Sequence, residues 1–218
     1  MFPLKDDIKS YNQPIVNVTL IIINILVFVY ELHIPNLNVF LYNNAFIPDM
    51  LFEHYDIINS FKRILLSMFL HGGFMHIIGN MWFLWIFGDN VEDALGHMNY
   101  LLFYILGGIV ASVIQGIISP YSTVPIIGAS GAISAVIGAY LVLYPHAKIL
   151  SLVFIFIFVT VIRIPAWFFI VFWFFIQYFN GIFSISMHSA SVAWFAHIGG
   201  FLFGFIVIKN TIAKKFKV

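Results

Sequence analysis

A chain of 218 residues that is 62% hydrophobic and only 9% charged cannot cover a large water-facing surface, because soluble domains usually carry about 25% charged residues. Its mean hydropathy of +1.01 is typical of a membrane protein. The net charge of +1 provides no basic field for nucleic acid, and the absence of cysteine excludes disulfides and thiolate chemistry.

Six apolar runs predict six membrane spans, since a spanning helix needs about 20 apolar residues. We expect an all-α polytopic bundle over residues 15–208, between a cytoplasmic N-terminal segment, residues 1–14, and a basic cytoplasmic tail, residues 209–218. The expected spans are residues 15–32, 74–87, 100–118, 130–144, 165–179 and 192–208.

The apolar stretch 149–162 is not expected to span the membrane. It is rich in β-branched residues, and Lys148 and Arg163 limit it to 14 residues, a length more typical of an interfacial or re-entrant segment. The segments 89–97 and 180–191 are expected to form loops between spans.

Basic residues are distributed unevenly over the two ends of these spans. Lys62 and Arg63 fall on one side and the other eight fall on the opposite side, so the positive-inside rule places both termini in the cytoplasm. The expected location is therefore the cell membrane, plasma or inner. The eight residues are Lys5, Lys9, Lys148, Arg163, Lys209, Lys214, Lys215 and Lys217.

Polar side chains within the spans indicate a functional site, because such groups are costly in hydrocarbon. Ser130 follows a loop containing Gly128 and begins a helix, and Gly131 is expected to keep the approach to its hydroxyl open. A serine needs an adjacent base to become a nucleophile, and His197 is the natural base near neutral pH. Because no Asp or Glu occurs from Pro165 onward, the sequence predicts a Ser–His dyad rather than a triad.

Further polar and small residues could complete this site. His76 and Asn80 are four residues apart on one helix face, and both can donate to a developing oxyanion together with the backbone N–H of Ser130. Gly200 and Gly204 have a GxxxG spacing that permits close helix packing. With six spans, the three helices that carry these residues enter the membrane from the same outer face, so their polar side chains can meet.

Each of these residues also has a structural interpretation. Ser130 could cap its helix, and the run GASG at residues 128–131 could be a packing strip. His197 could bond a backbone carbonyl, or could bind zinc together with His71 and His76. The chain has no HExxH motif and no acid near these histidines, so we expect no metal and no cofactor; His71 is expected to brace a loop.

Three motifs occur in order along the chain: SMFLHGGFMH at residues 67–76 followed by Asn80, GASG at 128–131, and AHIGG at 196–200 followed by Gly204. In this combination the chain resembles the rhomboid family of intramembrane serine proteases along nearly its whole length. The resemblance implies Ser130 as nucleophile, His197 as general base and acid, and His76 and Asn80 as oxyanion donors. It also implies a six-helix core that cleaves single-pass transmembrane substrates near their outer ends, surrounded by membrane lipid.

The chain departs from the family pattern in two places. The first outer loop, residues 33–62, is expected to be a re-entrant or interfacial hairpin, but the family's Trp-Arg pair reads Lys62-Arg63 here. The aromatic residue that often follows the nucleophile by four positions is Ser134. Another residue must therefore orient His197, and Trp194 is one candidate.

The predicted reaction is peptide-bond hydrolysis through an acyl-enzyme, on a substrate helix weakened by Gly, Pro or polar residues. Water would enter from the outer side, gated by the segment 180–191 and by movement of the helix that begins at Pro165. Two alternatives stay open: a non-catalytic binding protein on the same fold, and a small transporter. The first is disfavoured because Ser130 and His197 are both present. The second is disfavoured by the expected lack of intramembrane acids and inverted repeats.

Overall fold

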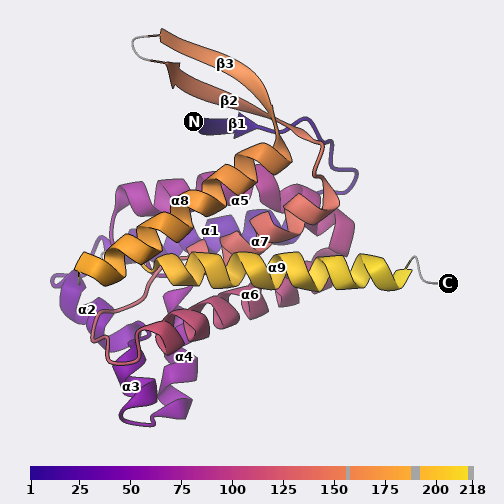
Figure 1. Ribbon diagram of the computed structural model, residues 1–218. Coiled ribbons are helices and arrows are strands. Elements are labelled where there is room, and N and C mark those ends of the chain that lie inside the picture. Colours follow the sequence, from indigo (N-terminus) through magenta and orange to yellow (C-terminus); the bar gives the residue numbers. More distant parts are fainter. Residues whose placement is uncertain (156–157, 188–191, 216–218) are drawn as a thin grey trace.

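The computed structural model describes residues 1–155, 158–187 and 192–215, which form a helical bundle with a small sheet on one side (Figure 1). Its elements, in chain order, are β1 (Phe2–Lys5), α1 (Ile15–Glu31), α2 (Leu37–Asn44), α3 (Pro48–Phe52), α4 (Ile57–Ser67), α5 (Phe74–Leu95), α6 (His97–Ile118), α7 (Ser130–Leu143), β2 (Lys148–Ile155), β3 (Phe158–Pro165), α8 (Ala166–Met187) and α9 (Trp194–Lys215).

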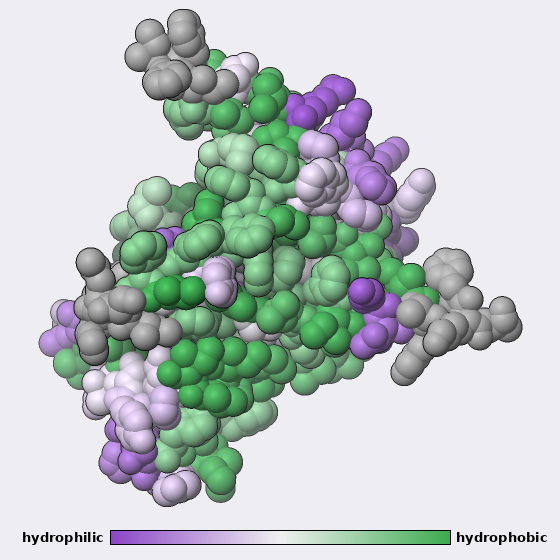
Figure 2. All heavy atoms as spheres, in the orientation of Figure 1, coloured by the Kyte–Doolittle hydropathy of each residue, from purple (hydrophilic) through white to green (hydrophobic). Residues whose placement is uncertain are grey.

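Three of the described helices contain stretches long and apolar enough to cross a membrane: His97–Ile118, Ala166–Ser184 and Trp194–Ile212. Helices α1 and α7 are apolar but shorter. The surface view shows hydrophobic residues over α8 and α9, with hydrophilic residues gathered near the C-terminal end of α9 and around α3 (Figure 2). The chain is therefore an integral membrane protein, and the count of six spans stays a prediction.

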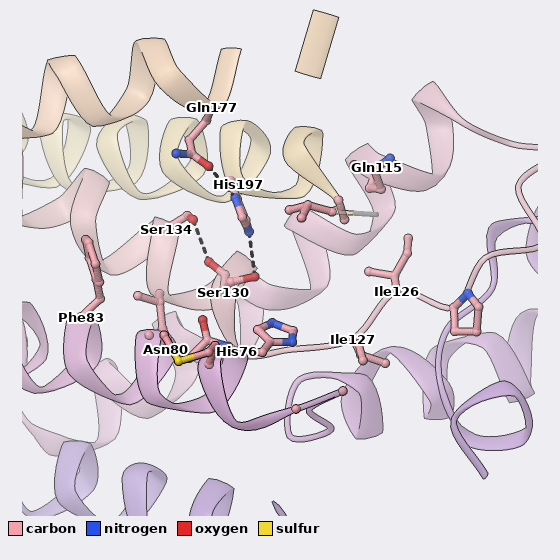
Figure 3. A pocket seen from close by; sticks show the side chains of 18 of the residues that line it. His76, Asn80, Phe83, Gln115, Ile126, Ile127, Ser130, Ser134, Gln177 and His197 are labelled. Atoms are coloured by element: carbon pink, nitrogen blue, oxygen red, sulfur yellow. Dashed lines mark hydrogen bonds between the residues drawn. The ribbon is translucent and has the colours of Figure 1, made fainter. Parts of the chain in front are cut away.

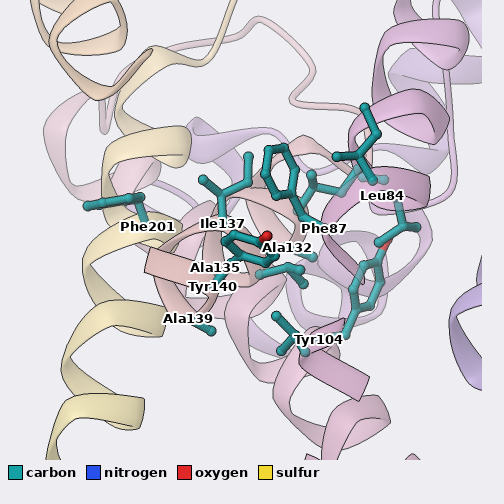
Figure 4. Close-up of a cluster of buried hydrophobic side chains, with 14 of the residues drawn as sticks. Leu84, Phe87, Tyr104, Ala132, Ala135, Ile137, Ala139, Tyr140 and Phe201 are labelled. Carbon is teal, nitrogen blue, oxygen red and sulfur yellow. The ribbon is translucent and has the colours of Figure 1, made fainter. Parts of the chain in front are cut away.

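Helix α7 lies at the centre of the bundle, in contact with α5, α6, α8 and α9. Residues 131–140 are all buried, and several are small, so neighbouring helices approach closely. Its larger side chains pack into the main core; Figure 4 shows Tyr140 beside Phe87 of α5, with ring centroids 5.0 Å apart. The central position of α7 fixes where its first residue, Ser130, lies.

Two segments expected as loops are largely helical, so those expectations were wrong. Helix α5 continues through residues 89–95 and α8 continues to Met187; residues 188–191 lie outside the described part of the chain. One acid of this part of α5 has a structural role. The Glu92 carboxylate accepts the backbone N–H groups of Val16 at 2.9 Å and Asn17 at 2.7 Å. A carboxylate stabilises a helix N-terminus, so Glu92 caps α1.

The described residues of the stretch 149–162 do not form a spanning helix. They belong to the antiparallel strands β2 and β3, and β1 pairs with β2 to give the sheet order β1-β2-β3. β-Branched side chains favour strands, so the expectation of an all-α fold was wrong for this segment, while its position at the membrane stays a prediction. The N-terminal segment is thereby tied to the bundle. The Trp82 indole N–H on α5 donates to the Pro3 carbonyl at 2.7 Å.

The first outer loop folds into the short helices α2, α3 and α4. Arg63, at the position where the family pattern also has arginine, anchors this region by donating from Nη1 to the carbonyl oxygen of Tyr42 at 3.2 Å. The depth of this loop in the membrane stays a prediction.

Candidate active site

Three helix N-termini meet at one end of the bundle. Ser130 is the first residue of α7, His197 is in the first turn of α9, and His76 is in the first turn of α5. They line a cavity of about 940 Å³, to which α8 contributes Trp173 and Gln177 (Figure 3). The structure thus brings these polar residues together on one side of the bundle, as we expected from the sequence.

The Ser130 hydroxyl is hydrogen-bonded directly to an imidazole. Its Oγ lies 2.8 Å from Nε2 of His197, and Figure 3 shows the two side chains pointing toward one another. The capping interpretation fails, because Ala129 is the N-cap residue of α7 and the cap forms no side-chain hydrogen bond. A serine hydroxyl that donates to a neutral imidazole is arranged for proton transfer.

The second nitrogen of His197 is bonded to a residue that the sequence analysis missed. Nδ1 lies 2.8 Å from Oε1 of Gln177 on α8. The ring also lies near-parallel to Trp173 at 6.4 Å and edge-on to Trp194 at 6.0 Å, measured between ring centroids. The missed signal was available, because Gln177 is the only amide side chain in the apolar run 165–179.

Asn80 is oriented by His71, which does more than brace a loop. The Asn80 Nδ2 lies 2.9 Å from Nε2 of His71, and Nδ1 of His71 lies 3.1 Å from the Phe69 carbonyl oxygen. A carbonyl only accepts, so Nδ1 carries the proton and Nε2 accepts from the Asn80 amide. One amide N–H of Asn80 is used in this way and the other can serve an oxyanion.

A buried acid also lies behind this pair, contrary to the expectation that no acid is near the histidines. Both carboxylate oxygens of Glu31, the last residue of α1, accept the backbone N–H of His71, at 3.0 and 3.1 Å. Glu31 is only 1% exposed. The expectation overlooked it because it ends the first apolar run.

Gly128 makes room for His76. Its φ of +109° is a conformation that L side chains rarely adopt. A Cβ at this position would lie 2.5 Å from Nε2 of His76 and 3.4 Å from Nδ2 of Asn80. His76 and Asn80 therefore approach the loop before Ser130 through space that only glycine leaves free.

The remaining glycines are packing positions. A Cβ on Gly131 would lie 2.7 Å from the Cβ of Ala111 on α6, so this residue permits helix contact rather than keeping the hydroxyl accessible as expected. Gly200 and Gly204 of α9 touch the carbonyl oxygens of Gly131 and Ala135 on α7. The packing-strip interpretation thus describes Gly131, while Ser130 faces the cavity.

The histidines of this site are used in ring and hydrogen-bond contacts. His71 and His76 meet edge to face, with ring centroids 5.1 Å apart. Among the described residues there is no group of three or more His, Cys, Asp or Glu side chains that could hold a metal ion.

Comparison with known proteins matches the sequence of this chain to one family. The family model described as Rhomboid domain matches residues 59–213. Rhomboid protein 1, mitochondrial, of Saccharomyces cerevisiae is 36% identical over 103 residues, which are 45% of this chain and 30% of the yeast protein. The rhomboid protease GluP of Bacillus subtilis is 40% identical over 79 residues, which are 36% of this chain and 15% of GluP.

A human protein, presenilin-associated rhomboid-like protein, mitochondrial, is 30% identical over 88 residues, which are 39% of this chain and 23% of the human protein. In each of these three relatives the matched region therefore spans less than a third of the relative's own length.

Proposed function

Because the chain belongs to the rhomboid family and has helices long and apolar enough to cross a membrane, we propose that it is an intramembrane serine protease. It hydrolyses peptide bonds in or near the outer end of a substrate's transmembrane helix. The observation that carries this proposal is the 2.8 Å separation between Oγ of Ser130 and Nε2 of His197 within the cavity.

In the first chemical step, Oγ of Ser130 attacks the carbonyl carbon and its proton passes to Nε2 of His197. The tetrahedral oxyanion is stabilised by the free N–H of the Asn80 amide, by His76 and by the backbone N–H of Ser130, which has no intrahelical acceptor at the start of α7. His197 then returns the proton to the leaving amine, the C–N bond breaks, and the acyl group stays on Ser130.

In the second step, His197 accepts a proton from a water molecule that attacks the acyl carbon, and the serine leaves with that proton. Polar groups and an open cavity at the helix N-termini supply a route for this water. A substrate must present an unwound segment, because the carbonyl groups of an intact helix are already bonded. Helix-weakening residues near the substrate's outer end therefore favour cleavage.

The substrate class and the orientation belong to the same proposal. A transmembrane substrate enters from the bilayer between α5 and α8, both of which line the cavity. With eight of ten basic residues on the side of the termini, both termini lie in the cytoplasm and the site opens outward, in the cell membrane. Single cysteines introduced near each terminus of this cysteine-free chain and labelled in intact cells test the orientation.

Labelling with a fluorophosphonate serine probe tests the activity. The detergent-purified protein is expected to label, whereas Ser130→Ala and His197→Ala are expected to remain unlabelled while retaining their thermal stability. The same three proteins are then incubated with a model transmembrane substrate that has a helix-weakening outer end. A folded wild-type protein that neither labels nor cleaves would instead favour a binding protein on this fold, and ion flux into liposomes would favour a transporter.

A further inference from the structure

The amide of Gln177 is held in one orientation by two hydrogen bonds. Its Nε2 donates to the Trp173 carbonyl oxygen at 3.3 Å, and its Oε1 lies 2.8 Å from Nδ1 of His197. Turning the amide over would place Oε1 against a carbonyl oxygen, and two acceptors cannot share a hydrogen bond. The oxygen of Gln177 therefore faces the imidazole.

This orientation determines which nitrogen of His197 carries the proton. An amide oxygen can only accept, so Nδ1 of His197 must donate to it, and in a neutral imidazole the other nitrogen then has a free lone pair. That nitrogen, Nε2, is the one that faces the Ser130 hydroxyl at 2.8 Å. The chain Gln177–His197–Ser130 thus has the hydrogen-bond order of a triad, with a neutral amide as third member.

We infer that Gln177 is a positioning residue that holds His197 in its reactive tautomer and makes this tautomer depend on the docking of α8. The inference rests on the proposed protease function. Gln177 has the required placement, because it is 6% exposed and joins two different helices. It acts in place of the aromatic side chain that Ser134 does not provide.

Helix α8 is loosely held compared with its neighbours. Its contacts with α7, α9 and the sheet are sparse, whereas α9 packs closely on both α6 and α7. Near its beginning α8 meets α5 through Phe169 and Phe87, whose ring centroids are 6.4 Å apart. A substrate helix that pushes α8 aside would remove the acceptor from Nδ1, so proton transfer requires α8 to return.

Variants of Gln177 test the tautomer. In Gln177→Leu, the rate constant of probe labelling and the kcat of substrate cleavage are both expected to fall about tenfold, as for loss of one buried hydrogen bond, with KM for the substrate unchanged. Gln177→Glu restores an acceptor and moves the acidic limb of the pH–rate profile to higher pH, because a carboxylate stabilises the imidazolium. Ser184→Ala, on the same helix with a hydroxyl that donates to the Gly181 carbonyl oxygen, is the matched control.

Two outcomes would overturn this role: wild-type kcat in Gln177→Leu, or a Gln177→Glu profile that coincides with that of wild type. If Gln177 had only a structural role, its replacement would lower stability without moving the pH–rate profile. The Gln177→Glu variant therefore distinguishes the two roles even if Gln177→Leu unfolds. An unlabelled wild-type protein would refute the protease function itself, which is a separate result.

A disulfide tests the dependence on α8. A Cβ on Gly181 would lie 3.4 Å from the Cβ of Trp194, close to the separation of roughly 3.5–4.5 Å in disulfides. Oxidation of Gly181→Cys/Trp194→Cys is expected to keep the probe-labelling rate of the reduced form but to abolish cleavage of the transmembrane substrate, reversibly. Equal cleavage by the fully cross-linked and reduced forms would overturn the coupling.

Discussion

The α-carbon of Gly200 lies against the carbonyl oxygen of Gly131, so α9 and α7 touch through their backbones. This contact lies about one turn after His197 on α9 and at the residue next to Ser130 on α7, and Gly204 repeats it against Ala135 one turn further on. Because the two side chains come from different helices, their 2.8 Å separation depends on this close approach. The geometry of the Ser130–His197 dyad therefore depends on the glycine packing between α7 and α9.

Gly200→Ala is expected to lower the free energy of unfolding by about 1–3 kcal/mol, because the added methyl group overpacks the interface. The helices must separate, so fluorophosphonate labelling of Ser130 should fall more steeply than stability does. Leu202→Ala on the outer face of α9, where the side chain is exposed, serves as the control. Thermal unfolding and labelling at wild-type values in Gly200→Ala would contradict this account.

Gly128→Ala combines backbone strain with a steric conflict. A non-glycine residue at φ of +109° costs about 1–2 kcal/mol, and the new Cβ would displace the His76 ring. We expect a folded protein with strongly reduced kcat. Adding His76→Ala to Gly128→Ala should then cost less than it does in the wild-type protein, and strictly additive effects in this double-mutant cycle would argue against the contact.

His71 should act on catalysis through Asn80. Asn80→Ala removes an oxyanion donor and is expected to lower kcat by about 10²–10³. His71→Ala leaves the amide without its orienting acceptor and should lower kcat by about tenfold. Once Asn80 is alanine, replacing His71 should change kcat no further; an additional tenfold loss would mean that His71 acts by another route.

Asp6 should make stability depend on pH. Burial, opposed by a hydrogen bond from Tyr140 and reinforced by the charge of Asp89, raises the pKa of this carboxyl from 3.8 to about 6. The folded protein then binds more protons at this group than the unfolded chain does, so its stabilising contribution is full below pH 3.8 and lost as the pH rises through about 6.

The measurement is the melting temperature of Asp6→Asn and wild type between pH 4 and pH 8. Ionisation of Asp6 destabilises the wild-type protein as the pH rises, whereas the amide of the variant does not ionise. The melting temperature of the variant relative to wild type should therefore increase across this interval. A difference that stays constant or decreases with rising pH would show that the carboxyl is not held neutral by burial. The neutral side chain of the variant can still accept from Asn90, which bonds Asp6 at 2.9 Å.

Local patterns in the sequence were sufficient to predict the longer helices and the main residues of the candidate site. Apolar runs between charged residues located the six longer helices, because helix-forming apolar stretches are contiguous in sequence. The spacing of His76 and Asn80 by four residues placed them on one helix face. The shared entry side of three helices then predicted that Ser130 and His197 lie close together. Helix boundaries were predicted less accurately. The acidic segment after residue 88 was expected to be a loop, but it continues α5, and its Glu92 caps α1.

What the sequence alone determined is therefore which residues are polar in an apolar chain and in which order their helices follow. Only the tertiary structure decided that Gln177 bonds His197, that Glu31 bonds the backbone of His71, and that β2 pairs with both Phe2–Lys5 and β3 in a sheet. Each of these contacts joins groups from separate elements. Their formation depends on how helices pack around α7, and periodicity within a single segment carries no information about such packing.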